Sequence, residues 1–457
     1  MAAQEYWDNH RALDYLLTRK DIDPEHIGVY GSSGGGTQIT YYIGLDPRVK
    51  VAAICSFFST RERTMELQGP SDGCQHIPYE GREQLEVPDF ALMMAPRPLL
   101  ILSGKYDFVD LWGAQQGFAE LQQCYKVLGV PEKVDMLTVE TGHGLGVEKR
   151  QKLVSWFKRW LKDDQSSVKK AAQDRFLLSD MFCTTRGQVN VSMPGALSIM
   201  QENVNQLDEW TSKREAFLSK GKKTVQAKML DLLGLKGLPD HKIRIEATGH
   251  DSMREYEQYK FQLIREGEMP VPCILIMPSR ANADSPVELR LQEEGKGTYL
   301  SEYANFAAAL TEGKILLLAD LRGLGETTDP AFYTDAKYWN REYRNAMVSM
   351  HIGRPIMGQR VVDILTLLDF CSEHELLKGH PVKVFANGIY GPVAIHAAYL
   401  DERINSVEIK HSVKTWKEYI ERPMQWDMYS NVLYGALKYY DLPDLIRLSN
   451  CPICFAD

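Results

Sequence analysis

The stretch IGVYGSSGGGTQITYYIGLD, residues 27–46, decides the fold. It starts with a short apolar run, continues into a glycine-rich turn at residues 31–36, and ends in a helix-like segment. The turn contains the pattern G-x-S-x-G, which places Ser33 in register, not Ser32. Glycines are needed there because the backbone is strained and side chains would collide with the following helix. The pattern predicts a buried strand, a sharp turn that exposes a serine, and a helix.

A serine is a weak nucleophile by itself, so this interpretation needs an acid and a base later in the chain. Residues 97–103, RPLLILS, read as a buried strand, and Asp107 follows at its C-terminal end. Functional loops of a parallel sheet gather at this edge. Asp107 is therefore the predicted acid. Asp110 is the alternative, and either residue could instead cap the helix that begins near Leu111.

The predicted base is His143, which lies between two glycines just after a strand at residues 134–139. The chain order serine, acid, histidine is the order that this kind of sheet uses. His10 and His26 are weaker candidates because they lie in helical or pre-strand positions. His76, in the loop GPSDGCQHIP at residues 69–78, is a weak candidate for substrate contact. The backbone N–H of Gly34, at the start of the helix, is the predicted oxyanion donor.

The pattern of a strand, a sharp turn and a helix occurs a second time, at a constant shift of 388 − 33 = 355 residues. Without gaps this shift pairs identical residues at several positions, among them Asp14 with Asp369, Asp46 with Asp401, Arg48 with Arg403 and Gly36 with Gly391. It also pairs Ser33 with Gly388, which has no hydroxyl group. The second copy is therefore predicted to keep the strand, turn and helix but to lack a nucleophile.

The two copies predict a tandem of doubly wound, mostly parallel α/β sheets. We expect a catalytic half at residues 1–163, a linker with helices at 164–235 and a degenerate, incomplete unit at 236–457. Laid over each other, the copies suggest that the first unit lacks its early strands and one oxyanion donor, and that the second lacks its last strands. We therefore expect the chain to be an internal part of a longer tandem protein. Alternatively, a partner chain or a domain swap completes the sheet.

Composition narrows the possible functions. The 457 residues are 44% hydrophobic and 25% charged, which is typical of folded globular proteins, and the length favours more than one domain. The net charge of −8 disfavours binding to nucleic acid or to an anionic membrane surface. The sequence contains no membrane-span pattern and no export signal. The pair Cys451 and Cys454 reads as part of a buried strand more readily than as a redox or metal site, and no metal or cofactor is predicted.

Several motifs together resemble the acetyl-xylan-esterase-like α/β-hydrolases, in particular large bacterial members with two hydrolase-like units. The motifs are RALDYLLTRKDIDPEHIGVYGSSGGGTQ, LDPRVKVAAICSFFSTRE, GPSDGCQHIP, APRPLLILSGKYDFVD and ETGHGLG. The resemblance covers Met1 to about Asp163 in specific motifs and residues 240–457 at the level of fold. It implies removal of acetyl or similar acyl groups from plant cell-wall polysaccharides, export from the cell, and no cofactor. It places the triad on Ser33, Asp107 and His143.

We therefore expect a serine carboxylesterase that works through an acyl-enzyme, with an acylated polysaccharide or oligosaccharide as substrate. Two alternatives stay open. One is a serine peptidase of the oligopeptidase type, which has a similar sharp turn at its serine. The other is an inactive fragment or polysaccharide-binding scaffold, which the missing strands and Gly388 would favour.

Overall fold

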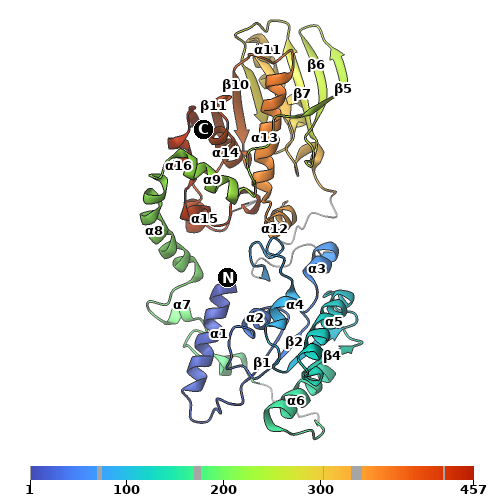
Figure 1. Ribbon diagram of the computed structural model, residues 1–457. Coiled ribbons are helices and arrows are strands. Elements are labelled where there is room, and N and C mark those ends of the chain that lie inside the picture. The colour runs from blue at the N-terminus through green and yellow to red at the C-terminus, as the bar shows by residue number, and fades with distance from the viewer. Residues whose placement is uncertain are drawn as a thin grey trace. The chain divides into compact units, whose positions relative to one another are not determined.

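The structure, a computed structural model, describes residues 2–68, 75–168, 176–301, 303–330, 342–425 and 428–456. The chain forms two compact units, Met1–Met181 and Phe182–Asp457. Figure 1 labels most of their elements. Among the described residues, no helix combines the length and the apolar character needed to cross a membrane.

The first unit is built on a four-stranded parallel sheet in the order β1-β2-β3-β4. The strands are β1 (Gly28–Ser32), β2 (Val51–Cys55), β3 (Leu99–Gly104) and β4 (Val134–Val139). Every residue of β2 and β3 is buried. Such continuous apolar runs are typical of parallel strands covered on both faces. The predicted α/β class is confirmed.

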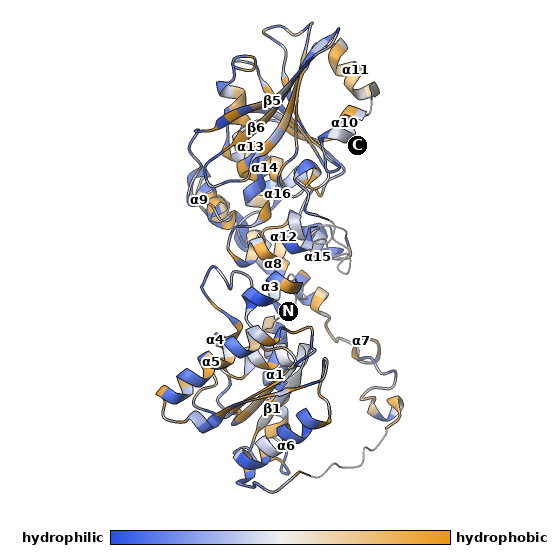
Figure 2. Ribbon diagram, turned by 90° about the vertical axis from the view of Figure 1, so that its right-hand side faces the viewer, coloured by the Kyte–Doolittle hydropathy of each residue, from blue (hydrophilic) through white to orange (hydrophobic). Residues whose placement is uncertain are grey.

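Helices cover both faces of this sheet. They are α1 (Ala2–Leu17), α2 (Gly34–Tyr42), α3 (Arg61–Gln68), α4 (Val87–Leu92), α5 (Leu111–Val127) and α6 (Val147–Lys162). Alternate residues of β2 point to opposite faces. Ala52 and Ile54 belong to the core shared with α2, α4 and α5, whereas Val51, Ala53 and Cys55 pack with Leu153 and Trp156 of α6. Figure 2 shows that much of α6 is otherwise polar, as expected for a surface helix.

The second unit is built on an eight-stranded mixed sheet in the order β12-β11-β10-β8-β9-β7-β6-β5. The strands are β5 (Arg244–Ser252), β6 (Tyr256–Ile264), β7 (Val271–Pro278), β8 (Val287–Leu291), β9 (Ile315–Ala319), β10 (Val382–Asn387), β11 (Ile404–Lys410) and β12 (Ile453–Phe455). The pairs β5–β6, β6–β7 and β7–β9 are antiparallel and the other four pairs are parallel. The strand β12 is short and only partly buried, not the buried strand expected from its sequence.

The helices of the second unit lie on both faces of its sheet. They are α8 (Ile199–Leu218), α9 (Lys222–Leu232), α10 (Lys296–Ser301), α11 (Tyr303–Thr311), α12 (Tyr343–His351), α13 (Ile356–Glu373), α14 (Tyr390–Leu400), α15 (Lys417–Glu421) and α16 (Leu442–Leu448), preceded by the short α7 (Val189–Ser192). The larger core contains residues of α9, α13, α14 and α16. A smaller core on other residues of the sheet contains residues of α10 and α11.

The segment expected as a linker, 164–235, is divided between the two units. Its residues 169–175 lie outside the described part of the chain. Its two long helices belong to the second unit, since Leu218 of α8 and Val225 and Met229 of α9 are buried in that unit's core. The boundary between the units falls after Met181.

Corresponding turns of the two units have closely similar backbone geometry. In the first, Ser33 has a φ of 57° and its N–H donates to Cys55 O at 3.0 Å. In the second, Gly388 has a φ of 61° and its N–H donates to Lys410 O at 3.0 Å. Both hydrogen-bond partners are related by the same shift of 355 residues as the two turns.

A charged cluster is also repeated at this shift. In each unit one arginine joins two aspartates. Arg48 donates to Asp46 at 2.8 Å and 2.6 Å and to Asp14 at 2.5 Å. Arg403 donates to Asp401 at 2.9 Å and 2.6 Å and to Asp369 at 2.7 Å. In the first unit the arginine therefore joins the loop before β2 to α1, and in the second unit it joins the loop before β11 to α13.

Candidate active site

Ser33 lies at the sharp turn between β1 and α2. Its φ of 57° and ψ of −123° form a strained backbone for a residue with a side chain. The turn is also crowded. A Cβ at Gly31 would overlap the carbonyl oxygen of Gly35, and a Cβ at Gly36 would lie 2.9 Å from Cys55 O. The glycines at these two positions therefore allow the turn. Ser33 lies in the turn itself, whereas Ser32 is the last residue of β1.

Asp107 follows β3, and the structure holds its carboxylate in a buried position. The side chain is 1% exposed. Oδ1 accepts a hydrogen bond from the Val109 N–H at 3.1 Å and one from His143 Nδ1 at 2.8 Å. Burial by itself would raise the pKa of Asp107. The hydrogen bonds of His143 and Val109 and the nearby Ser56 hydroxyl outweigh it, so that the pKa lies below its usual value.

His143 lies on the loop after β4, and its imidazole meets Asp107. Because an ionised carboxylate only accepts hydrogen bonds, the 2.8 Å contact places the proton on Nδ1 and leaves Nε2 as the basic nitrogen. The imidazole is 30% exposed, and the ring of Phe108 stacks on it with the centroids 4.3 Å apart. Ser33 and His143, both described, do not share a hydrogen bond in this structure. Such contacts are often long before substrate binds.

Gly34 is the first residue of α2. The N–H of a first helical residue has no acceptor within its own helix. This donor and the positive end of α2 both adjoin Ser33. A negative charge that developed next to the serine would be stabilised there.

The other residues singled out in the sequence have different surroundings. Asp110 caps α5 through a 2.7 Å hydrogen bond from the Gly113 N–H, and it pairs with Arg63. His10 contacts Asp46, and His26 contacts Asp23. Cys451 and Cys454 are both free thiols.

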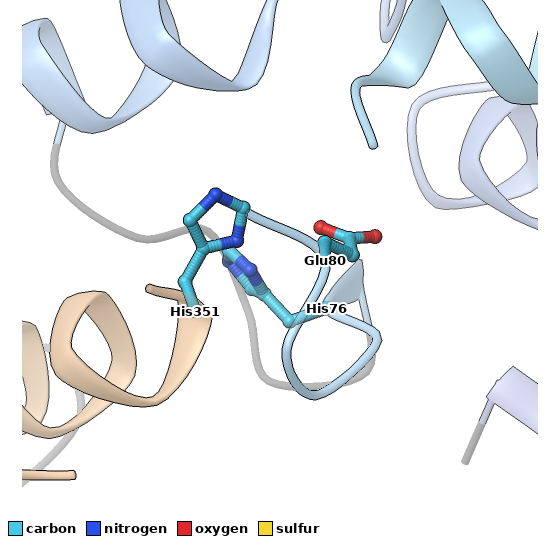
Figure 3. Close-up of side chains that lie close together, drawn as sticks. All are labelled: His76, Glu80 and His351. Atoms are coloured by element: carbon cyan, nitrogen blue, oxygen red, sulfur yellow. The ribbon is translucent and has the colours of Figure 1, made fainter. Parts of the chain in front are cut away.

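His76 lies with Glu80 on the segment before α4, as Figure 3 shows. Residues 69–74 of the loop that precedes His76 lie outside the described residues. Glu80 joins a buried cluster in which it accepts hydrogen bonds from Tyr41 at 2.8 Å and from Arg61 at 3.2 Å. His351, also drawn in Figure 3, belongs to α12 of the second unit. The substrate contact expected for His76 stays a prediction.

In the second unit, a carboxylate lies against the turn at Gly388. A Cβ at Gly388 would overlap Oε2 of Glu293. The same oxygen accepts a 3.1 Å hydrogen bond from the Ile389 N–H. The shift of 355 residues makes this N–H the counterpart of Gly34, the predicted oxyanion donor of the first unit.

Two polar residues near the predicted triad were not predicted from the sequence. Ser56 follows β2 and is 3% exposed, and Lys149, in the first turn of α6, is 1% exposed. Ser56 lies within the motif LDPRVKVAAICSFFSTRE, but the motif itself assigns it no role, and Lys149 lies in none of the motifs. The one available signal was a lysine on the apolar side of a helix, at the end where a positive charge is unfavourable.

Comparisons with known proteins agree with the resemblance noted in the sequence. No family model matches the chain. The protein named "Putative hydrolase YtaP" of Bacillus subtilis is 26% identical over 157 residues, which are 34% of this chain and 52% of the relative. The chain thus spans about half the length of the curated relative that it matches.

Similar solved structures include esterases. One is a "putative acetyl xylan esterase" from Bacteroides fragilis, with a TM-score of 0.44 and 13% identity, covering 53% of this chain and 68% of the other. Another is an acetyl xylan esterase from Paenibacillus, with a TM-score of 0.34 and 16% identity, covering 53% and 78%. These likenesses assign no activity to this chain.

Proposed function

We propose that the first unit is a serine ester hydrolase in which Ser33 is the nucleophile, His143 the general base and Asp107 the acid. The observation that carries this proposal is the 2.8 Å hydrogen bond between His143 and the buried Asp107, at the same edge of the sheet as the strained turn of Ser33. All three residues follow strands of the same parallel sheet, β1, β3 and β4, whose C-terminal ends share that edge.

The reaction follows from these positions. His143 Nε2 takes the proton of Ser33 as its Oγ attacks the carbonyl carbon of the ester. The Gly34 N–H stabilises the negative oxygen of the tetrahedral intermediate. The bond to the alcohol oxygen then breaks, and His143 protonates the leaving alcohol. Water, deprotonated by His143, attacks the acyl-enzyme, and the acid and free Ser33 are released.

We further propose that the ester is an acetyl or similar acyl group on a carbohydrate. The names of the similar solved structures support this substrate class. Exposed aromatic side chains next to Asp107 in the chain support it as well, because Tyr106 and Phe108 are each more than half exposed. Exposed aromatic rings offer flat apolar faces on which a sugar ring can pack.

The two units are proposed to be tandem copies, of which only the first is catalytic. Three observations support the repeat: the shared shift of 355 residues, the matching turns at Ser33 and Gly388, and the repeated arginine–aspartate clusters. The carboxylate of Glu293 at the turn of Gly388 supports the loss of activity in the second unit.

The test is hydrolysis of an aryl acetate by the full chain and two alanine variants. Ser33→Ala should lower kcat by at least about a thousandfold, since without the hydroxyl no acyl-enzyme forms. Ser32→Ala, one residue away on β1, is the matched control and should keep kcat within about twofold of the parent.

Equal loss in both variants would point to damage of the turn and not to a nucleophile. A Ser33→Ala protein as active as the parent would refute the proposal. A folded parent without any esterase activity, but with cleavage of short peptides that depends on Ser33, would favour the peptidase alternative.

A further inference from the structure

Lys149 occupies a position that is costly for a lysine. It lies in the first turn of α6, where the helix dipole disfavours a positive charge. Its side chain is 1% exposed, and burial of an ammonium group is unfavourable unless it is paired. Among the described residues, no carboxylate forms an ion pair with it. A residue that breaks several stabilising rules at once is a candidate for a functional role.

The contacts of Lys149 lead to the loop of His143. Its ammonium donates hydrogen bonds to Ser56 Oγ at 3.2 Å and to the carbonyl oxygen of Gly144 at 3.0 Å. The Gly144 N–H in turn donates to Ser56 Oγ at 3.1 Å. Three hydrogen bonds thus close a ring on the residue that directly follows His143. These three hydrogen bonds hold the loop that carries the imidazole against β2 and α6.

Ser56 connects this ring to Asp107. Its hydroxyl oxygen accepts hydrogen bonds from Lys149, from Gly144 and, at 3.7 Å, from the Cys55 thiol, which leaves its own proton to be donated. Asp107 Oδ2 is a buried oxygen that has no hydrogen-bond donor in this geometry. The Ser56 hydroxyl is close enough to help lower the pKa of Asp107. We therefore expect the Ser56 proton to be directed toward this second oxygen of the Asp107 carboxylate.

We propose that Lys149 is a positioning residue for the triad, acting through Ser56 on Asp107 and through Gly144 on the loop of His143. This inference rests on the proposed hydrolase function. Lys149 touches neither the substrate nor the reacting atoms. Its charge holds the Ser56 hydroxyl in the orientation that completes the surroundings of Asp107, and its bond to Gly144 keeps the imidazole over the carboxylate.

The first test replaces the lysine by an uncharged side chain of similar length. Lys149→Met should lower kcat for an aryl acetate by about 10- to 100-fold with KM nearly unchanged, because misplaced catalytic groups slow the chemical steps and not binding. Lys152→Met is the matched control. Lys152 lies on the same helix and pairs with Asp135 at 2.6 Å, so its loss should leave kcat unchanged. Equal kcat per folded molecule in Lys149→Met and the parent would overturn the proposal.

A second variant keeps the test meaningful if Lys149→Met does not fold. Ser56→Ala removes the link and should lower kcat by a similar factor. In a double variant that folds, the losses should multiply only in part, because the two substitutions remove hydrogen bonds of the same ring. If Ser56→Ala has the kcat of the parent, or if the two losses multiply in full, the proposed route through Ser56 is wrong.

A spectroscopic measurement separates failure of this inference from failure of the proposed function. The proton on His143 Nδ1, in its hydrogen bond with Asp107, should give a downfield NMR resonance that is absent in His143→Gln. Lys149→Met should shift or broaden this resonance, and Lys152→Met should not. An unchanged resonance in Lys149→Met would overturn the positioning role, whereas a parent that shows this pattern but no esterase activity would overturn only the hydrolase function.

Discussion

The carboxylate of Asp107 couples the site to pH. Its pKa lies below the ordinary value of 3.8 in the folded chain, because the hydrogen bonds that it accepts outweigh its burial. A group with a lowered pKa stabilises the fold at pH values above its ordinary pKa, and this stabilisation is lost as the pH falls through the folded value. The ionised form of Asp107 therefore contributes to stability at neutral pH and not in strong acid.

Replacing Asp107 by asparagine should show this dependence. The free energy of unfolding in urea should be lower for Asp107→Asn than for the parent at pH 7, and the difference should shrink as the pH falls below about 4. Measurements of both proteins at pH 7, 5, 4 and 3 would check it. A difference that stays constant or grows toward acid pH would contradict the role given to the carboxylate.

Single residues could be predicted from the sequence where strands and glycines frame them. Asp107 follows a buried strand and His143 follows a strand and lies between two glycines, and the structure brings their side chains together. Ser56 and Lys149 could not be predicted, because each gains its meaning from contacts across 88 to 93 residues of sequence. The choice between Asp107 and Asp110 also needed coordinates, since both carboxylates follow the same strand.

At the scale of elements, the turn between β1 and α2 has room for a methyl group at some of its glycines and not at others. Gly31→Ala should destabilise the chain by about 1–3 kcal/mol, because its methyl group would overlap the carbonyl oxygen of Gly35. Gly34→Ala, three residues later, has no atom within 4 Å of the new methyl group and serves as the control. Thermal unfolding of both variants would check this. A melting temperature lowered as much by Gly34→Ala as by Gly31→Ala would contradict the packing of the turn.

Strands with a clear apolar pattern could be predicted, and strands with exposed faces could not. The predicted strand at residues 134–139 has the bounds of β4, and the strand predicted at residues 97–103 overlaps β3, Leu99–Gly104. The strands β5 and β6 were not predicted, since β5 is largely exposed and most of β6 is only half-buried. A half-exposed strand at the edge of a sheet gives a weak hydrophobic signal, and its pairing is set by its neighbour and not by its own residues.

At the scale of the whole molecule, the proposed loss of activity in the second unit has a direct test. Adding Gly388→Ser to Ser33→Ala should not restore esterase activity. The new side chain would meet Glu293, whose carboxylate already takes the Ile389 N–H. Assays of the single and double variants with an aryl acetate would check it. Activity in the double variant clearly above that of Ser33→Ala would show that the second unit retains the rest of a catalytic site.

The proposed repeat could be recognised as a pattern in the sequence because the paired residues have structural roles. Arg48 and Arg403 hold equivalent aspartates, so the same letters recur at the same spacing. The boundary between the units was harder to predict from the sequence. The helices α8 and α9 have the length and polarity of linker helices, and only their packing on the core of the second unit assigns them to it.

The central claim is that Ser33 is an activated nucleophile, and mapping a covalent adduct tests it most directly. The full chain would be treated with a fluorophosphonate, digested, and examined by mass spectrometry. We expect one adduct, on the peptide that contains Ser33, and none in the folded Ser33→Ala variant. An adduct on another serine, or no adduct in a parent chain shown to be folded, would contradict the assignment of this site.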